Sequence, residues 1–266
     1  MDLEFEKYEA TGNDFIVVRV PSPDALSPKQ AMALCDRHFG VGADGVLLIS
    51  PSAEGRARMT VLNADGSRPE MCGNGLRCAA LAVSGDEDRS DFVMETDAGP
   101  RTCRLERTGP TSALVTTGLG KAQDQGEIVH PLGTADGRRE GTFVRVSMGN
   151  PHAILFAPQM TEHELDRLGE GLSARITGGS NVEVASVVAP QRIQLAVWER
   201  GVGRTLACGT GAGATAAAAV SLGLAEAGVP IEVHLPGGRL ELVVGNDRTV
   251  TLTGPARRVF TGHLGA

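Results

Sequence analysis

An internal repeat is the feature of this chain that most restricts its fold. The dipeptide Gly12-Asn13 recurs as Gly149-Asn150, 137 residues later, and the turn at 72–75, Cys-Gly-Asn-Gly, recurs 136 residues later at 208–211 as Cys-Gly-Thr-Gly. Two more pairs keep the same offset: Asp44 with Asn181, and Asn63 with Glu199. Such a period in a chain of 266 residues is far too long for a stacked repeat protein, so it indicates a duplication. We expect two similar domains related by a pseudo-twofold axis, with the two cysteine turns facing each other across the cleft between them.

Short runs with strand character dominate both halves of the chain, and only four segments have the pattern of a helix: 27–39, 76–83, 162–169 and 212–222. The expected fold class is α+β, in which each domain is an antiparallel, barrel-like β-sheet around a central α-helix. Segment 118–139 is rich in Gly, Asp and Gln and shows little periodicity, which suits the passage between domains. We expect domains at 1–117 and 118–252, with residues from about 253 to 266 completing the first.

Composition narrows the classes of partner. A formal net charge of −7 and an aromatic content of 3% argue against a surface that binds nucleic acid. The first residues lack a basic segment followed by an apolar run, and no stretch approaches 18 uninterrupted apolar residues. We expect a cytoplasmic protein without a membrane partner, acting on a small molecule. Whether the chain forms a homodimer stays open.

Two of the five cysteines are distinguished by their context. Five is an odd number, and the irregular spacing in a chain of this length favours reduced thiols. Cys35, Cys78 and Cys103 are interpreted as small buried apolar residues. Cys72 and Cys208 each precede a glycine-rich turn and a helical segment, so each is expected where a helix begins. Unpaired backbone N–H groups at that position favour a thiolate.

A matched pair of thiols suits one kind of chemistry. Inverting a stereocentre next to a carboxylate requires a base on one face of the carbon and an acid on the other, and a thiolate and a thiol can fill these roles and exchange them. The negative charge that develops on the carboxylate needs fixed donors, which the backbone N–H groups of the two turns could supply: Gly73, Asn74, Gly209 and Thr210. The sequence has no pyridoxal-bearing lysine motif, zinc-ligand spacing or phosphate loop, so no cofactor is expected.

At these residues the chain resembles the diaminopimelate epimerase family. The motifs that carry the resemblance match in order and spacing over nearly the whole chain: Thr-Gly-Asn-Asp-Phe at 11–15, Asn-Ala-Asp-Gly-Ser at 63–67, Met-Cys-Gly-Asn-Gly-Leu-Arg-Cys at 71–78, Met-Gly-Asn-Pro-His at 148–152, Glu-Arg-Gly at 199–201 and Ala-Cys-Gly-Thr-Gly at 207–211. The resemblance implies a cofactor-independent two-base epimerase that interconverts LL- and meso-2,6-diaminopimelate for lysine and cell-wall synthesis.

The resemblance also implies roles for single residues. His152 and Glu199 would polarise the catalytic Cys72 and Cys208. The distal amino-acid end of the substrate would be held by Asn13, Asn63, Asn150, Asn181, Glu199 and Arg200.

Two alternatives remain at this point. A racemase of another amino acid, also independent of pyridoxal phosphate, could share the fold and the cysteines. A dinucleotide-binding oxidoreductase is more remote: the glycines at 209, 211 and 213 imitate its fingerprint, but no strand with a terminal acid follows at the required distance.

Overall fold

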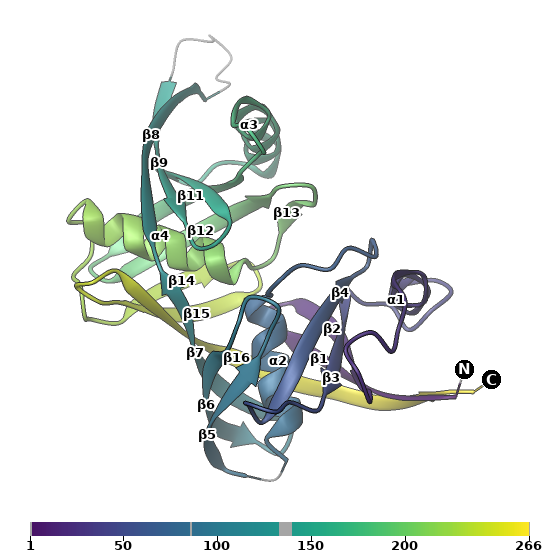
Figure 1. Ribbon diagram of the computed structural model, residues 1–266. Helices are drawn as coiled ribbons and strands as arrows, with labels where there is room; N and C mark the ends of the chain where they lie inside the picture. Colours follow the sequence, from purple (N-terminus) through teal and green to yellow (C-terminus); the bar gives the residue numbers. More distant parts are fainter. Residues whose placement is uncertain (1, 86, 133–139, 266) are drawn as a thin grey trace. The chain divides into compact units, whose positions relative to one another are not determined.

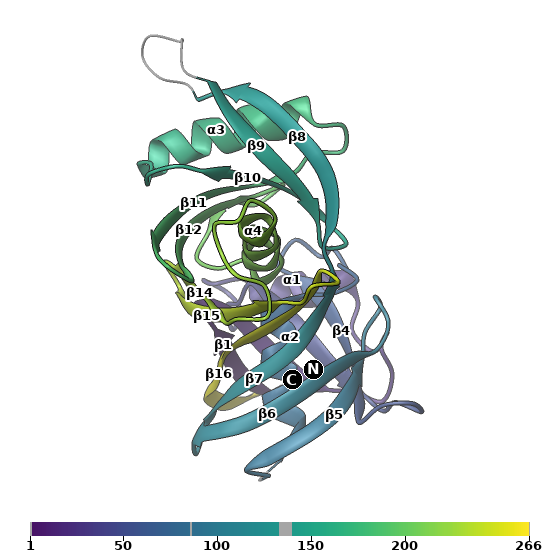
Figure 2. The same ribbon diagram turned by 90° about the vertical axis from the view of Figure 1, so that its left-hand side faces the viewer.

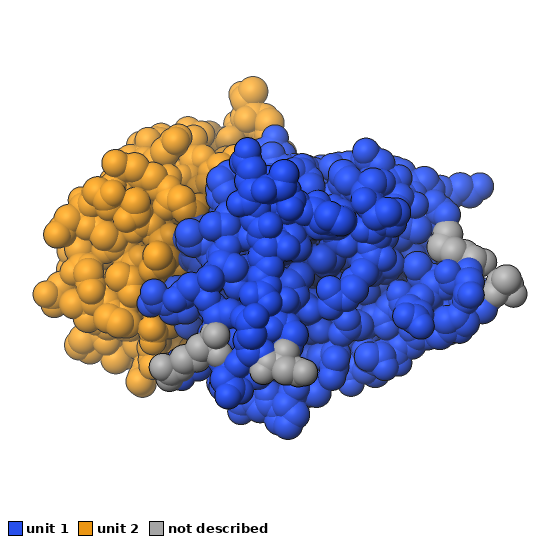
Figure 3. Space-filling view, turned by 60° about the horizontal axis from the view of Figure 1, so that its bottom comes forward, with its two compact units in different colours: residues 1–118, 253–266 blue, residues 119–252 orange. Residues whose placement is uncertain are grey.

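The computed structural model describes residues 2–85, 87–132 and 140–265 (Figure 1). The chain forms two compact units (Figure 3). Unit 1 comprises Met1–Gly118 and Thr253–Ala266, and unit 2 comprises Leu119–Leu252. Two strands, β7 (Ser112–Lys121) and β16 (Thr249–Leu264), continue from one unit into the other.

Unit 1 is a closed barrel of eight strands with a helix inside. Its other elements, in chain order, are β1 (Leu3–Ala10), β2 (Asn13–Arg19), α1 (Pro28–Cys35), β3 (Gly45–Ser50), β4 (Ala57–Asn63), α2 (Gly73–Val83), β5 (Arg89–Glu95) and β6 (Arg101–Gly109). Strands β1 to β7 are neighbours in sequence order, and β16 follows β7 and pairs again with β1, which closes the barrel. Helix α2 packs against β1, β2, β3, β4 and β6, and nearly all of its residues are buried.

Unit 2 repeats this plan as a curved sheet. Its elements are β8 (Gln123–Pro131), β9 (Glu140–Ser147), β10 (Pro151–Phe156), α3 (Glu162–Arg175), β11 (Asn181–Ala189), β12 (Arg192–Glu199), β13 (Gly203–Thr205), α4 (Gly209–Ser221), β14 (Ile231–Leu235) and β15 (Gly238–Val244). The strand order is β8-β9-β10-β11-β12-β14-β15-β16, and β13 pairs with β12. Figure 2 views α4 nearly end-on, with the strands curving around it. The expected α+β class, a barrel-like sheet around a helix, is confirmed.

The expectation of purely antiparallel sheets is wrong, because each sheet also contains parallel pairs of strands. Four neighbouring pairs are parallel, namely β2–β3, β4–β5, β10–β11 and β12–β14. A parallel pair needs a crossover connection, usually a helix, and each of the four helices in the described part of the chain lies in one of these connections. Apart from the additional strands β7, β8, β13 and β16, the same ββαββαββ order occurs in each half, and the duplication is visible in the elements themselves.

Strand periodicity explains why each half needs two helices. Along β2 and β3, Phe15, Val17 and Leu47 join the apolar cluster around α2, whereas Ile16, Val18 and Val46 join the cluster around α1. Successive side chains point to opposite faces of a sheet, so one helix covers each face. All of β3 is consequently buried.

Several elements differ from their expected bounds. Helix α1 ends at Cys35 rather than near 39, and α3 extends to Arg175. Segment 118–139 is less irregular than expected: it contains the end of β7 and all of β8, while residues 133–139 lie outside the described residues. Most side chains of β8 are exposed, so its sequence lacks the apolar alternation that marks a half-buried strand.

The two Gly-Asn turns have the same backbone requirement. Gly12 has φ 82° and Gly149 has φ 98°, in the region that favours glycine. These turns begin β2 and precede β10. No helix in the described part of the chain has the length and apolar character needed to cross a membrane.

Candidate active site

Cys72 and Cys208 each lie at the N-cap of the helix inside their own unit. The sulfur of Cys72 accepts a hydrogen bond from the backbone N–H of Gly75 at 3.4 Å, and the sulfur of Cys208 accepts one from Gly211 at 3.3 Å. A cap side chain normally offers oxygen to this donor, so here a thiolate would receive the same stabilisation. The helix starts expected from the sequence are therefore present in both halves.

The third residue after each cysteine must be glycine for a steric reason. A Cβ on Gly211 would lie 2.6 Å from Oε1 of Glu183 and 3.3 Å from the sulfur of Cys208. A Cβ on Gly75 would lie 2.9 Å from Cδ2 of Leu47 and 3.4 Å from Cβ of Cys72. At Gly211 a side chain would crowd both Glu183 and the sulfur of Cys208, whereas at Gly75 it would clash with the end of Leu47 and make ordinary contact with Cys72.

We expect Gly211→Ala to lower the free energy of unfolding by about 1–3 kcal/mol, although alanine has the better helix propensity by about 1 kcal/mol. Denaturant titration measures this, with Gly118→Ala as the control, because the nearest atom to a Cβ there, Oγ1 of Thr102, is 3.9 Å away. Equal stabilities of the two variants would show that the Gly211 site has room to relax.

In unit 1, a buried arginine organises the residues around the start of α2. Arg77 is 0% exposed, and its guanidinium donates to Oδ1 of Asn74 at 2.9 Å, Oγ1 of Thr11 at 3.0 Å, and the carbonyls of Gly73 and Pro255 at 3.3 and 3.1 Å. Burial lowers the pKa of Arg77 to about 10, and the negative charges of nearby groups, Cys72 among them, oppose that shift. Two of these hydrogen bonds hold the segment that carries Cys72, at Gly73 and Asn74, and the other two connect it to Thr11 and Pro255.

The asparagines of unit 1 lie on two neighbouring turns. Nδ2 of Asn74 donates to Oδ1 of Asn13 at 3.3 Å, and Asn13 in turn donates to Asp44 at 2.6 Å. Asn63 ends β4, where Nδ2 donates to the hydroxyl of Ser67 at 2.9 Å. The structure therefore links Asn13 directly to Asn74, and places Asn63 in the turn that follows β4.

In unit 2, Cys208 lies beside two carboxylates. The negative charges of Glu199 and Glu183 both act on the thiol. Burial raises the pKa of Cys208 well above its usual value, and the negative charges of Glu199 and Glu183 raise it further, while its hydrogen bonds with Thr210 and Gly211 lower it. Burial also raises the pKa of Glu199, which accepts a hydrogen bond from Thr205 at 2.6 Å. These surroundings favour the thiol form of Cys208. The raised pKa of Glu199 also makes its carboxylate better able to accept a proton.

Glu183 is a site residue that the sequence analysis missed. It is 0% exposed, and its Oε1 lies 2.6 Å from Nδ1 of His152, which is itself 1% exposed. Its other oxygen, Oε2, has no hydrogen-bond partner among the described residues. The signal was present: Glu183 is the one charged residue of strand β11 and lies between two valines. Val182 and Val184 face α3, so Glu183 faces the other side of the sheet.

The remaining candidates of unit 2 lie along the adjoining strand ends. Asn150 precedes β10, where Oδ1 lies 3.1 Å from Nε2 of His152 and Nδ2 donates to Thr210 at 3.4 Å. Asn181 begins β11 opposite His152, and its Oδ1 accepts from the backbone N–H of Arg200 at 2.9 Å. The exposed Arg200 guanidinium donates to the carbonyl of Gly178.

Each unit therefore gathers its own set of candidate residues. Unit 1 brings together Cys72, Gly73, Asn74 and Asn13, with Asn63 nearby in sequence at the end of β4. Unit 2 brings together Cys208, Gly209, Thr210, Asn150, His152 and Glu199, with Asn181 and Arg200 joined by their own hydrogen bond. That the two sets meet at one substrate stays a prediction.

The other three cysteines are buried and free, as the sequence analysis expects. Burial raises the pKa of Cys35 to about 11, of Cys103 to about 12, and that of Cys78 further. A thiol whose pKa is raised in the folded state contributes stability that is present below its unfolded pKa, near 9, and is lost as the pH rises from there through the folded pKa.

We therefore expect the free energy of unfolding to fall as the pH is raised from about 8 to about 10. Each fully protonated buried thiol contributes about 1.4 kcal/mol to that fall at pH 10. Urea titrations at the two pH values measure the difference, and Cys103→Ala should reduce it by about that amount. A stability that is unchanged over this range would contradict the assigned pKa shifts.

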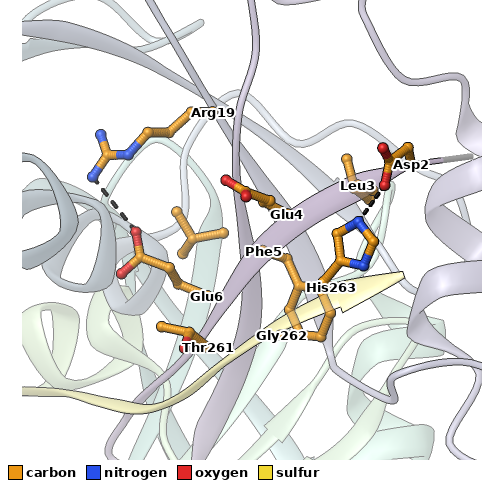
Figure 4. A pocket seen from close by; sticks show the side chains of 10 residues that line it. Asp2, Leu3, Glu4, Phe5, Glu6, Arg19, Thr261, Gly262 and His263 are labelled. Atoms are coloured by element: carbon orange, nitrogen blue, oxygen red, sulfur yellow. Dashed lines mark hydrogen bonds and ion pairs between the residues drawn. The ribbon is translucent and has the colours of Figure 1, made fainter. Parts of the chain in front are cut away.

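A surface depression of unit 1 lies apart from this chemistry. It measures about 810 Å³ and is lined by residues of β1, β2 and β16, with Asp2 bonded to His263 and Arg19 3.5 Å from Glu6 (Figure 4). None of the candidate residues lines it.

Comparison with known proteins agrees with the motifs. The family model described as diaminopimelate epimerase matches residues 5–124 and 144–259. A diaminopimelate epimerase of Desulfitobacterium hafniense is 40% identical over 98% of each chain, and diaminopimelate epimerase 1 of a Nostoc species is 39% identical over 99% of this chain and 100% of its own.

A solved structure supports the fold alone. A protein of Pseudomonas aeruginosa described as a predicted epimerase superposes with a TM-score of 0.76 at 20% identity, covering 99% of both chains. Its fold agrees with the helix-filled sheets of the two units. Because the family model and the curated relatives cover nearly the whole chain, the protein belongs to the diaminopimelate epimerase family.

Proposed function

We propose that the protein interconverts LL- and meso-2,6-diaminopimelate, a step of lysine and peptidoglycan precursor synthesis, by proton transfer at the α-carbon between two cysteines. The observation that carries this proposal is the equivalent placement of Cys72 and Cys208, each capping a buried helix in a chain of this family. A dinucleotide-binding oxidoreductase has no support in the matches, which are to epimerases.

The surroundings of the two thiols support different resting states for them. Arg77 places a positive charge near Cys72, whereas Cys208 lies beside the carboxylates of Glu199 and Glu183. A cation favours a thiolate, and neighbouring anions favour a thiol. We infer that the resting enzyme holds Cys72 as the base and Cys208 as the acid, with Glu199 accepting the hydrogen bond of the Cys208 thiol.

In the proposed reaction, the Cys72 thiolate takes the α-proton and becomes a thiol. The electron pair of the broken C–H bond moves into the carboxylate as an enediolate, and Cys208 then donates its proton to the opposite face and becomes a thiolate. No electron is gained or lost overall, so no redox partner is required. In the reverse direction the two cysteines exchange roles.

The helix starts supply donors for the enediolate. The backbone N–H groups of Gly73, Asn74, Gly209 and Thr210 lie in the first turns of α2 and α4, where backbone donors lack intrahelical partners. Fixed donors of this kind are each worth about 10²–10³ in rate. That this chemistry uses no cofactor stays a prediction.

The far end of the substrate is assigned to the polar residues at strand ends. Arg200 would pair with the distal carboxylate, and Asn13, Asn63, Asn150 and Asn181 would complete its hydrogen bonds. A substrate without that end would leave polar groups unsatisfied, at a cost of about 1–3 kcal/mol each. A cytoplasmic location and a homodimer are compatible with this assignment and are tested separately, by fractionation and by sedimentation.

The test is an assay with purified protein and LL-diaminopimelate, followed by chromatographic separation of the stereoisomers. We expect meso-diaminopimelate to accumulate to equilibrium without added cofactor, and alanine to be turned over at least about 100-fold more slowly. A racemase of another amino acid would instead show its higher rate with that amino acid. Equal rates with diaminopimelate and alanine would contradict the assignment of the distal residues.

A further inference from the structure

A continuous chain of polar contacts connects the buried carboxylate of Glu183 to the sulfur of Cys208. Oε1 of Glu183 lies 2.6 Å from Nδ1 of His152, and Nε2 of that ring lies 3.1 Å from Oδ1 of Asn150. Nδ2 of Asn150 lies 3.4 Å from the hydroxyl oxygen of Thr210, which lies 3.5 Å from Sγ of Cys208. All five residues belong to unit 2.

The donors and acceptors in these groups determine which way each hydrogen bond in the series points. Both ring nitrogens of His152 face oxygen acceptors, so a ring that satisfies both carries two N–H groups and a positive charge, matched by the carboxylate of Glu183. Because the amide oxygen of Asn150 accepts from the ring, its NH₂ group donates to Thr210. A hydroxyl that accepts from Asn150 has its single proton left for the sulfur of Cys208.

We propose that Glu183 is a positioning residue that fixes the direction of this chain, so that the Thr210 hydroxyl donates to the sulfur of Cys208. The sulfur then has two donors, the Thr210 hydroxyl and the Gly211 N–H, at the moment it gives its proton away. The catalytic meaning of this arrangement rests on the proposed function, because it presumes that Cys208 becomes a thiolate in each turnover.

Glu183→Gln changes the reactivity of Cys208 in opposite directions depending on whether Glu183 acts by its charge or through the hydrogen bonds. The charged and titratable groups that act on Cys208 are Glu199, Glu183 and, through the chain, His152. Glu183 by its charge alone disfavours a thiolate at Cys208. If charge were its only effect, Glu183→Gln would make Cys208 more reactive. If Glu183 acts through the chain, the loss of the Thr210 donor makes Cys208 less reactive.

The experiment measures alkylation of the free protein by iodoacetamide between pH 7 and 10, with the modified cysteines resolved by peptide mapping. We expect Glu183→Gln to slow alkylation of Cys208 about tenfold at pH 8 and to move its pH profile upward. Both Cys72 and Cys208 should react as in the wild type in Glu170→Gln, which removes an exposed carboxylate of α3. Faster or unchanged alkylation of Cys208 would overturn the proposal.

A double-mutant cycle identifies the route. Thr210→Val should slow alkylation of Cys208 as much as Glu183→Gln, Thr210→Ser should restore it, and Glu183→Gln should have no further effect in the Thr210→Val background. If the two substitutions each slowed the alkylation of Cys208 and their effects multiplied in the double variant, Glu183 would not act through Thr210.

A second variant and a substrate-free readout complete the design of the experiment. If Glu183→Gln does not fold, Asn150→Ala interrupts the same chain and replaces it in the cycle. Because alkylation is read without substrate, a wild-type protein that fails to epimerise diaminopimelate would refute the proposed function and leave this test intact.

Discussion

Replacing Cys208 with alanine is expected to lower the rate of diaminopimelate epimerisation by about 10²–10⁴-fold, and Cys72→Ala to do the same. Each thiol is the proposed proton carrier for one face of the α-carbon, and a methyl group at either helix start can neither take nor give a proton. Steady-state assays in both directions measure the loss. Thermal unfolding of each variant should show a folded protein, because alanine fits where cysteine did.

Cys78→Ala is the matched control for this pair. Cys78 lies inside α2 and is 0% exposed in the apolar cluster around that helix. We expect a modest loss of stability and a nearly unchanged rate. If Cys208→Ala retained most of its turnover, the two-base mechanism would be wrong.

Replacing Arg77 with methionine is expected to lower the free energy of unfolding by about 3 kcal/mol or more. The substitution leaves buried acceptors at Asn74, Thr11 and two carbonyls without their donor, and each costs about 1–3 kcal/mol. Thr11 is also held at φ 52°, a conformation that costs energy in a threonine and that the bond from Arg77 helps to maintain. Denaturant titration measures the change.

Arg104→Met serves as the control, because Arg104 is exposed and pairs only with the exposed Asp91 in the described structure. Surface pairs of this kind contribute about 0–1 kcal/mol. If Arg77→Met cost no more than Arg104→Met, the hydrogen bonds of the buried guanidinium would not support unit 1. A folded Arg77→Met protein should also react more slowly at Cys72 with iodoacetamide, because it lacks the nearby positive charge.

The repeat in the sequence accounts for much of the fold. A constant offset of 136 or 137 residues anticipated two halves with equivalent helices after Cys72 and Cys208, and α2 and α4 begin there. The parallel pairs could not be read from the strands, because a fully buried strand such as β3 has no alternation that distinguishes its direction. Strand β8 was missed for the opposite reason, since most of its side chains face solvent.

Some residues of the candidate site could be predicted from local sequence patterns, whereas others depend on how distant strands pair. The positions of Cys72 and Cys208 follow from local helix-start signals, which a sequence displays directly. The pairing of His152 with Glu183 depends on the parallel register of β10 and β11, which places residues about 30 apart side by side. Glu183 could have been suspected only as a charge in an apolar strand, because nothing in the linear sequence specifies its partner.

The most direct test of the central claim follows isotope from the solvent. Wild-type protein is incubated with LL-diaminopimelate in deuterated water without added pyridoxal phosphate or metal, and both stereoisomers are analysed by mass spectrometry at early times. Two cysteines on opposite faces predict that the newly formed meso isomer carries one deuterium while the remaining LL isomer stays unlabelled. Equal labelling of both isomers, or formation of the meso isomer without deuterium, would contradict the two-thiol account.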